Sequence, residues 1–278
     1  MTPTALPPPR ARDPVTVPGE LCVLIYGAPE TADTVELTLA AAAAQVAPAT
    51  EILVASGRDD RMRWTNASNR PAAEFRQAGS EGLLAAGLRA ARATGARWLW
   101  LLDGSSIPEP GALGGLLAGV DAVSQGAAAP LLVSSRILSV SGHLCADAIP
   151  RHEIFEKERS VEATARCLVQ LRTACHGSLL VSATAVDRFE PPRSDLPPGI
   201  DLMEWSARLL RHDEDTGYLA AASVAVRSFE EPVRESNLRL WLARMRASTG
   251  SGWSPTERLW EVFLIGEEIL ALWSMRKA

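Results

Sequence analysis

The chain has 278 residues, of which 47% are hydrophobic and 22% are charged, and its formal net charge is −5 at pH 7. This composition is typical of a globular protein that is long enough to bury a substantial core as one large domain or two small ones. The net charge argues against a general nucleic-acid binder, which carries a basic surface field, and no apolar run is long enough to span a bilayer.

The N-terminal segment, residues 1–19, is rich in proline and has no apolar core of the kind that a signal peptide needs. We expect it to be a disordered tail. The four cysteines form no CxxC pair and have no histidines at zinc-ligand spacing, so we expect buried free thiols in a reducing, cytoplasmic compartment. These cysteines are Cys22, Cys145, Cys167 and Cys175.

The first part of the chain alternates strands and helices. Leu21–Tyr26 and Glu51–Ala55 are short apolar runs that predict strands, and the alanine-rich segment Thr31–Val46 between them predicts a helix. A strand–helix–strand unit of this kind predicts two parallel strands. The polar segment Arg58–Arg70 is expected to be irregular, and Ala73–Arg76 is expected to be a short strand.

A central strand is predicted at Trp98–Leu102, after a helix over Gly79–Thr94. Its continuous apolar run is typical of a strand that is buried on both faces of a parallel sheet. The run ends at Asp103, and Gly104 and the two serines that follow favour a turn. Ligands of open α/β sheets bind beyond the carboxyl ends of the strands, so Asp103 is a candidate binding residue as well as a candidate turn cap.

The second half of the chain continues the α/β pattern. Strands are predicted at Ala127–Leu138, Gly177–Ser182 and Gly217–Val226, a helix or strand at Ser160–Leu171, a loop at Pro191–Gly199, and helices from Gly111, from Ala183, over Leu202–Leu209, at Asn237–Arg246 and at Thr256–Arg276.

Two carboxylates mark the start of the helix that follows the proline-rich loop. Asp201 stands at its first turn and Glu204 lies three residues on, so both share one edge of the helix. A capping box has the same spacing, and so does a general base with a supporting carboxylate. The residues alone leave both interpretations open.

Four segments together resemble the family 2 nucleotide-sugar glycosyltransferases of the GT-A fold, nearest to actinobacterial galactofuranosyl- and rhamnosyltransferase-like proteins. The segments are LCVLIYGAPE, EILVASG, WLWLLDGSSIPEPGAL and GIDLMEWSARLLRHDEDTGYL. The resemblance implies a Rossmann-like, mostly parallel mixed sheet flanked by helices over residues 20–228, with a C-terminal helical extension over residues 229–278.

The resemblance also implies roles for single residues. Asp103, with Ser105, would hold a divalent metal, Mg²⁺ or Mn²⁺, against the diphosphate of the donor. Tyr26, Gly27 and Ser56 would line the nucleotide pocket together with Asp103. Asp201, supported by Glu204, would deprotonate the acceptor hydroxyl for an inverting attack. The acceptor would be a cell-envelope glycan or a lipid-linked glycan.

The sequence departs from the family pattern at several of these positions. The acidic cluster is reduced to Asp103-Gly104-Ser105, Ala55 and Leu202 stand where acidic residues are usual, and no histidine follows the last strand. These departures keep open an alternative, a catalytically degenerate GT-A protein that binds a partner. A nucleotidyltransferase is a third interpretation, but the first strand lacks the glycine-rich basic loop it would need.

The C-terminal helix predicted at Thr256–Arg276 carries large apolar residues with acidic residues between them. Packing or formation of a homo-oligomer is the favoured interpretation. Peripheral contact with the inner face of a membrane is the alternative, and the acidic residues count against it.

Overall fold

The structure is a computed structural model that describes residues 20–27, 32–56, 61–66, 73–76, 82–124, 129–142, 148–150, 168–174, 177–196, 200–210, 216–228, 255 and 259. The strands are β1 (Leu21–Gly27), β2 (Glu51–Ser56), β3 (Arg61–Asn66), β4 (Ala73–Arg76), β5 (Trp98–Asp103), β6 (Ser106–Pro108), β7 (Leu132–Leu138), β8 (Ala148–Pro150), β9 (Leu168–Ala174), β10 (Ser178–Ser182) and β11 (Gly217–Arg227). The helices are α1 (Ala32–Ala43), α2 (Leu83–Arg92), α3 (Ala112–Ser124), α5 (Ala183–Arg188) and α6 (Ile200–Leu209).

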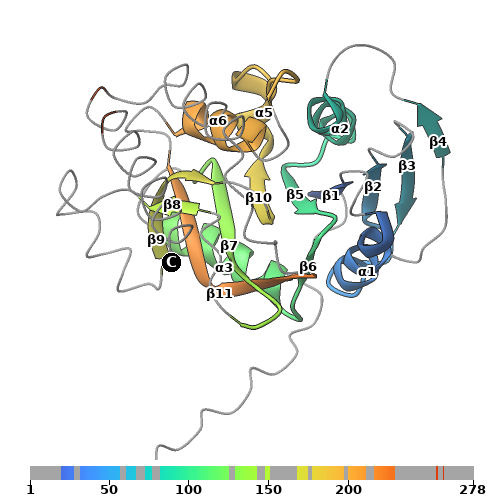
Figure 1. Ribbon diagram of the computed structural model, residues 1–278, viewed down its shortest axis with the longest axis horizontal. Coiled ribbons are helices and arrows are strands. Elements are labelled where there is room, and N and C mark those ends of the chain that lie inside the picture. The colour runs from blue at the N-terminus through green and yellow to red at the C-terminus, as the bar shows by residue number, and fades with distance from the viewer. Residues whose placement is uncertain are drawn as a thin grey trace, which may run out of the picture.

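The described strands form one mixed sheet in the order β4-β3-β2-β1-β5-β10-β7-β11-β9-β8, and β6 pairs with β11 (Figure 1). Parallel pairing joins β1 to β2, β1 to β5 and β7 to β11, as the strand–helix–strand pattern predicts for the first of these pairs. The remaining pairs are antiparallel, including both pairs made by β10. The α/β class, with a mixed sheet flanked by helices, is confirmed.

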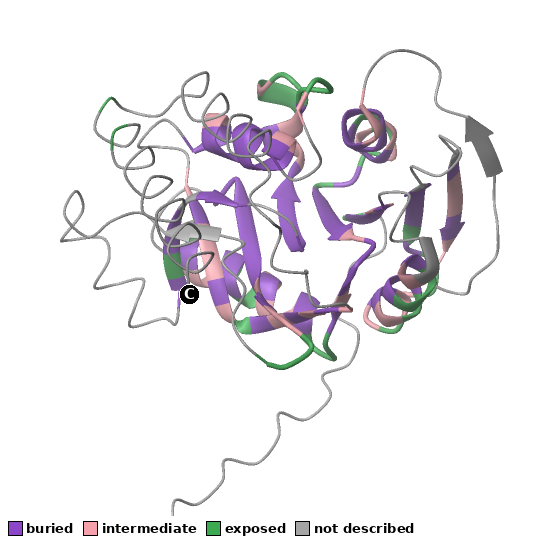
Figure 2. Cartoon of the chain, viewed as in Figure 1, coloured by how far each residue is buried: buried purple, intermediate pink, exposed green. Residues whose placement is uncertain are grey.

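Helices cover both faces of the sheet. Apolar side chains of α2, α5 and α6 pack with Cys22 and Leu24 of β1 on one face, and those of α1 and α3 pack with Val23 and Ile25 on the other. Alternate residues of β1 therefore point into two different cores, and the central strands are buried on both faces (Figure 2). Full burial of each such side chain stabilises the fold by about 1.5–3 kcal/mol.

The prediction for residues 58–70 was wrong, because β3 occupies part of that segment and pairs antiparallel with β2. Its polar residues alternate with Met62, which is 1% exposed, and with the half-buried Trp64. That alternation has the period of a strand, and Thr65 on the opposite face is buried as well, at 5% exposure. The short strand β6 also begins where the sequence predicted a turn.

A chain of buried polar groups crosses the middle of the sheet. Trp100 Nε1 donates to Ser178 Oγ at 3.0 Å, and Ser178 Oγ is hydrogen-bonded to Ser135 Oγ at 2.8 Å. Ser135 Oγ is in turn hydrogen-bonded to Ser223 Oγ at 2.6 Å, and Ser223 Oγ donates to the carbonyl of Ala112 at 2.8 Å. These bonds tie β5, β10, β7 and β11 to the start of α3.

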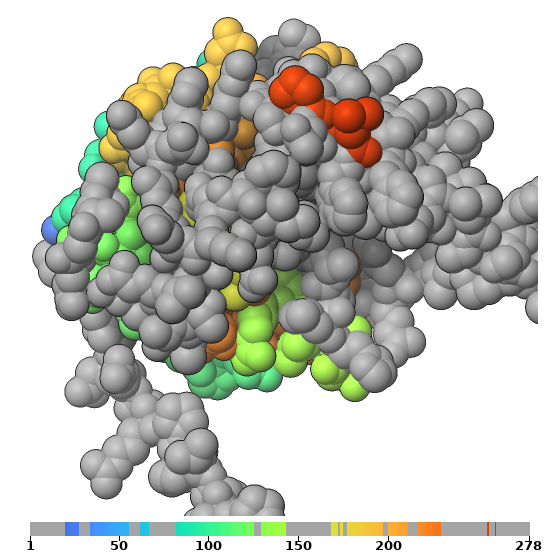
Figure 3. Space-filling view, turned by 90° about the vertical axis from the view of Figure 1, so that its left-hand side faces the viewer, coloured from blue at the N-terminus to red at the C-terminus, as the bar shows by residue number. Residues whose placement is uncertain are grey.

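Several predictions fall outside the described residues: the tail at 1–19, Cys145, Cys167 and Cys175, and the helix at Asn237–Arg246. Of the predicted C-terminal helix only Leu259 is described; it is 72% exposed and lies at the surface with Pro255 (Figure 3). Cys22 is a buried free thiol, as expected. Among the helices that the structure describes, none combines the length and the hydropathy needed to cross a bilayer.

Candidate active site at the carboxyl edge of the sheet

Three parallel strands end together and bring the predicted nucleotide-binding residues to one edge. Tyr26 of β1 pairs with Asp103 of β5, and Gly27 pairs with Ser56 of β2. All four positions therefore lie at the carboxyl edge of β2-β1-β5, where ligands of open α/β sheets bind. Their role in binding a nucleotide stays a prediction.

The turn after β5 is held by hydrogen bonds on several sides. The Gly104 N–H donates to the Tyr26 carbonyl at 2.8 Å. The Gly104 carbonyl accepts from the hydroxyls of Thr34 at 2.6 Å and Thr38 at 3.2 Å, both on α1. Since β1 and α1 both anchor this turn, the Asp103 carboxylate leaves the sheet in a fixed direction.

Ser105 satisfies the Asp103 carboxylate from within the same turn. The Ser105 N–H donates to Asp103 Oδ1 at 3.0 Å, and the Ser105 hydroxyl donates to Asp103 Oδ2 at 2.9 Å. Asp103 is half-buried and Ser105 is buried. The candidate turn cap predicted from the sequence is thus present, and Ser105 acts as a donor to the carboxylate in this geometry.

Gly177 supports the same turn from β10. The Asp103 N–H donates to the Gly177 carbonyl at 2.8 Å. Gly177 has a φ of +122°, a conformation that side-chain-bearing residues rarely adopt. A Cβ placed on it would lie 2.6 Å from Cγ1 of Ile137, so both the backbone and the packing require glycine here.

The end of β11 closes over the turn and adds polar groups that the sequence analysis did not assign. The Ser228 N–H donates to the Ser105 carbonyl at 2.8 Å, and Arg227 pairs with Ser106 of β6. Arg227 is only 6% exposed, and the hydroxyls of Ser106 and Ser228 are buried without hydrogen-bond partners. In the sequence, the feature that could have indicated this cluster is Arg227, which directly follows the predicted strand Gly217–Val226.

The predicted metal site at Asp103 and Ser105 offers few ligands. Among the described residues, no group of three or more His, Cys, Asp or Glu side chains is close enough to hold a metal ion. Asp103 contributes a single carboxylate, and Ser105 already donates to both of its oxygens. Divalent cations prefer several oxygen ligands, so this donor set does not fit a metal without ligands from a substrate.

The two predicted catalytic carboxylates lie on α6, as expected. Asp201 is half-buried in the first turn, and its Oδ1 accepts from the Leu202 N–H at 2.7 Å. Glu204 is 3% exposed, with Oε1 2.8 Å from Nε of Arg208 and Oε2 buried without a hydrogen-bond partner. A neighbouring Asp195, and to a smaller extent Glu204, raise the pKa of Arg193.

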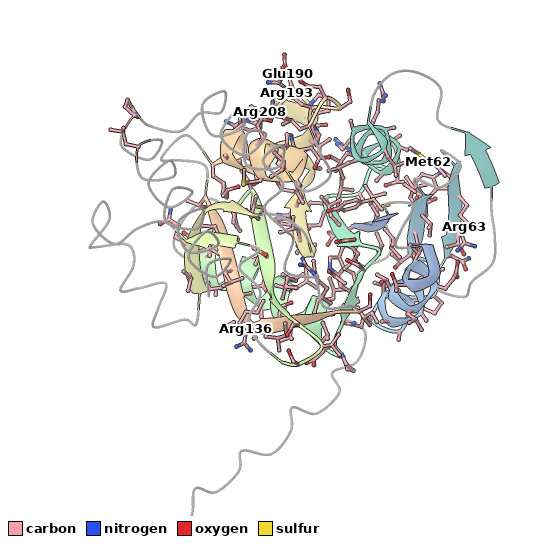
Figure 4. All side chains as sticks on the ribbon, viewed as in Figure 1. Met62, Arg63, Arg136, Glu190, Arg193 and Arg208 are labelled. Carbon is pink, nitrogen blue, oxygen red and sulfur yellow. The ribbon has the colours of Figure 1, made fainter. Side chains whose placement is uncertain are left out.

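The structure does not bring α6 beside the Asp103 turn. Ser182 at the end of β10 pairs with Trp98 at the start of β5, and the chain continues from there into α5 and α6. Figure 1 accordingly shows α6 and β6 at opposite edges of the sheet. Figure 4 shows Arg208, the partner of Glu204, beside α6. It shows Arg136 of β7 on the opposite side of the molecule, toward β6.

Comparisons with known proteins find similarity among solved structures. No family model and no curated protein matches the chain. It is similar to two crystal structures of S. aureus TarS 1–349. The first has a TM-score of 0.47 at 9% identity, and the match covers 86% of this chain and 68% of that chain. The second, a complex with UDP-GlcNAc, has a TM-score of 0.48 at 10% identity and covers 86% and 69%. The function proposed below therefore rests on the chain's own residues.

Proposed function

We propose that this chain is a glycosyltransferase of the GT-A type that uses a nucleotide-sugar donor. The observation that carries the proposal is the polar cluster at the carboxyl edge of β5: a pinned Asp103 turn beside the buried Arg227 and the two buried serine hydroxyls without partners. The four segments that resemble family 2 enzymes support the same function.

The cluster suits a ribose and a diphosphate. Asp103 can accept hydrogen bonds from ribose hydroxyls, as carboxylates do at strand ends that bind nucleotides. Arg227 offers a permanent positive charge to the phosphates, and Ser106 and Ser228 offer hydroxyl donors. The Ser106 and Ser228 hydroxyls are buried without partners, which is costly, so a ligand that supplies acceptors gains from them. This division of roles stabilises the leaving group through the chain's own side chains.

The resemblance assigns the acceptor base to Asp201, with Glu204 beside it, on α6. Because α6 lies at the edge of the sheet opposite the Asp103 turn, the contacts described above do not bring either carboxylate to the donor cluster. A carboxylate that removes the acceptor proton would support in-line attack and inversion at the sugar. The resemblance favours a cell-envelope glycan or a lipid-linked glycan as acceptor.

Calorimetry with UDP, GDP and dTDP, with and without Mn²⁺, tests the donor site. We expect saturable binding of one nucleotide, weakened about tenfold or more by Arg227→Gln because a charge-assisted contact is lost. Asp103→Asn should also weaken it. Asp121→Asn, an exposed carboxylate of α3, is the matched control and should leave affinity unchanged. No binding of any of the three nucleotides would contradict the proposal.

A turnover assay with sugar donors built on the nucleotide that binds, together with a glycan acceptor, tests the acceptor base. Loss of transfer in Asp201→Asn with unchanged nucleotide affinity would support the assignment from the resemblance, because the base acts on the acceptor. Full activity in both Asp201→Asn and Glu204→Gln would show that the base lies elsewhere.

The degenerate, partner-binding alternative is favoured by one observation, namely that the turn offers a single carboxylate and Ser105 already donates to both of its oxygens. It predicts no nucleotide binding, and self-association that Leu259→Glu weakens in light scattering. Leu259 is the exposed apolar residue that this test uses.

A further inference from the structure

A cavity of about 390 Å³ lies between α2, α5 and α6, which cover the face of the sheet opposite α1 and α3 (Figure 1). Its apolar lining includes Leu88 of α2, Val186 of α5, and Phe189 and Pro191 from the segment that follows α5. Cavities of this size with a mostly apolar lining and few polar groups are typical small-molecule sites. Among the described residues that line it, none belongs to the proposed donor site at the carboxyl edge of β5.

Contacts between the surrounding elements hold the walls of this cavity in place. Arg92 of α2 forms a two-fold hydrogen-bonded ion pair with Asp187 of α5, with Nε and one terminal nitrogen each 2.8 Å from a carboxylate oxygen. Arg208 of α6 donates to the backbone carbonyls of Glu190 at 3.2 Å and Pro191 at 3.0 Å, so α6 fixes the segment that follows α5 (Figure 4). Because each tie joins two elements around the space, the cavity is preformed, as ligand sites usually are.

Trp205 of α6 lines the cavity and carries a hydrogen-bond donor that the protein leaves unused. The residue is 1% exposed, and its indole Nε1 has no hydrogen-bond partner. A buried indole N–H almost always finds an acceptor, because leaving it unpaired is costly. A ligand that brings an acceptor oxygen removes this cost.

The charged part of the lining favours a neutral ligand. Both oxygens of Asp187 accept hydrogen bonds from Arg92, so these two charges compensate each other. Arg89 also lines the cavity, and it already interacts with another group. A charged ligand would therefore leave water without gaining an unpaired countercharge, and burial of a charge without a partner is costly. Among the described lining side chains, the buried polar atom without a partner is Nε1 of Trp205.

We propose that this cavity binds a small neutral molecule with a hydrocarbon body and one acceptor oxygen, as in a ketone or an ester. The hydrocarbon body lies against Leu88, Val186 and Phe189, and the oxygen accepts from the Trp205 N–H. A molecule of about nine non-hydrogen atoms is within the capacity of a cavity of this size. The inference does not depend on the proposed transferase activity.

Ligand-detected NMR titration of the full chain with octan-2-one tests the site. We expect one saturable site with a Kd on the order of 0.1–1 mM. Octanoate has the same chain length but carries a charge, so it should bind about tenfold more weakly or less. Val186→Trp fills the cavity and should abolish octan-2-one binding, whereas Val140→Trp adds the same ring at a residue 59% exposed outside the cavity and should not. Cooperative unfolding in urea shows that each variant is folded.

Trp205→Phe tests the hydrogen bond, because it keeps an aromatic ring and removes the N–H. It should weaken octan-2-one about fivefold or more, and it should leave toluene, which has no acceptor oxygen, within about twofold of its affinity for the wild-type chain. Equal weakening of both ligands would mean that the substitution changes the shape of the cavity, and it would overturn the assigned hydrogen bond.

An absence of saturable octan-2-one binding to the wild-type chain overturns the proposal. So does undiminished binding by folded Val186→Trp, which places the ligand elsewhere. Octanoate that binds as tightly as octan-2-one contradicts a neutral ligand. Because the nucleotide titration concerns different residues, each of these failures leaves the donor-site test intact.

Discussion

Replacement of Gly177 by alanine is the most direct perturbation of the candidate site that does not touch its polar groups. A residue other than glycine at a φ of +122° costs about 1–2 kcal/mol in backbone strain. The added Cβ also meets Cγ1 of Ile137 at 2.6 Å, and Ile137 is 2% exposed, so it has little room to move. Overpacking of this kind costs about 1–3 kcal/mol. We expect a total loss of about 2–5 kcal/mol in the free energy of unfolding.

Gly95→Ala is the matched control. Gly95 also has a positive φ, of +83°, but a Cβ placed there would have no heavy atom within 4 Å. It should therefore lose only the strain component, about 1–2 kcal/mol. Urea denaturation of both variants gives the difference, which isolates the contact with Ile137. In an Ile137→Ala background, Gly177→Ala should cost less than it does in the wild-type chain, because the contact with the added Cβ is gone.

Equal losses in Gly177→Ala and Gly95→Ala would refute the packing explanation. A second readout concerns the site, because the Gly177 carbonyl accepts from the Asp103 N–H. Gly177→Ala should weaken nucleotide binding, whereas Gly95→Ala should not. Unchanged nucleotide affinity in a folded Gly177→Ala protein would mean that the Asp103 turn is not positioned by β10.

Three other predictions concern buried groups. Ser206→Ala removes the hydroxyl that accepts from the Ala174 N–H at 2.9 Å and donates to its carbonyl, so unfolding free energy in urea should fall by about 1–3 kcal/mol; no loss would show that water replaces the hydroxyl. Met62→Ala should cost about 2–5 kcal/mol in the same assay if β3 belongs to the core, and a loss below 0.5 kcal/mol would contradict that placement. Burial, and secondarily the charge of Glu51, raise the pKa of the Cys22 thiol from 9.0 to about 12. The native thiol thus stays protonated where the unfolded thiol ionises, so this contribution to stability is complete below pH 9 and falls by about 1.4 kcal/mol per unit as the pH rises toward 12. Peptide mapping after thiol alkylation at pH 8 should find Cys22 modified only in denaturant.

The sequence predicted the elements whose signal is local. The continuous apolar runs ending at Tyr26 and Leu102 form the central strands β1 and β5. The helix predicted over Leu202–Leu209 is α6. The strand β3 was missed because its arginines dominate the composition, although Met62 and Trp64 alternate with them. Its stability as a strand comes from pairing with β2, which no local pattern reveals.

The candidate site was predicted only in part for the same reason. Asp103 follows from the rule that ligands bind beyond the carboxyl ends of the strands, whereas Tyr26 was implied by the family resemblance. Ser106 and Ser228 acquire their place from the antiparallel contact of β6 with β11, two segments far apart in the chain. A pairing between distant segments depends on the whole fold, so a reading of neighbouring residues could not supply it.

The chain of hydroxyl hydrogen bonds from Trp100 to Ala112 favours one register of the strands over shifted alternatives. Each hydroxyl is useful only when its neighbours are present, and Ser135, Ser178 and Ser223 arrive on three different strands. A one-residue slip of any strand would turn its serine to the other face and leave the rest of the chain buried without partners. Misregistered sheets are therefore penalised at the centre of the molecule, where apolar contacts alone would tolerate a wrong partner. Folding of this half of the sheet should consequently be all-or-none.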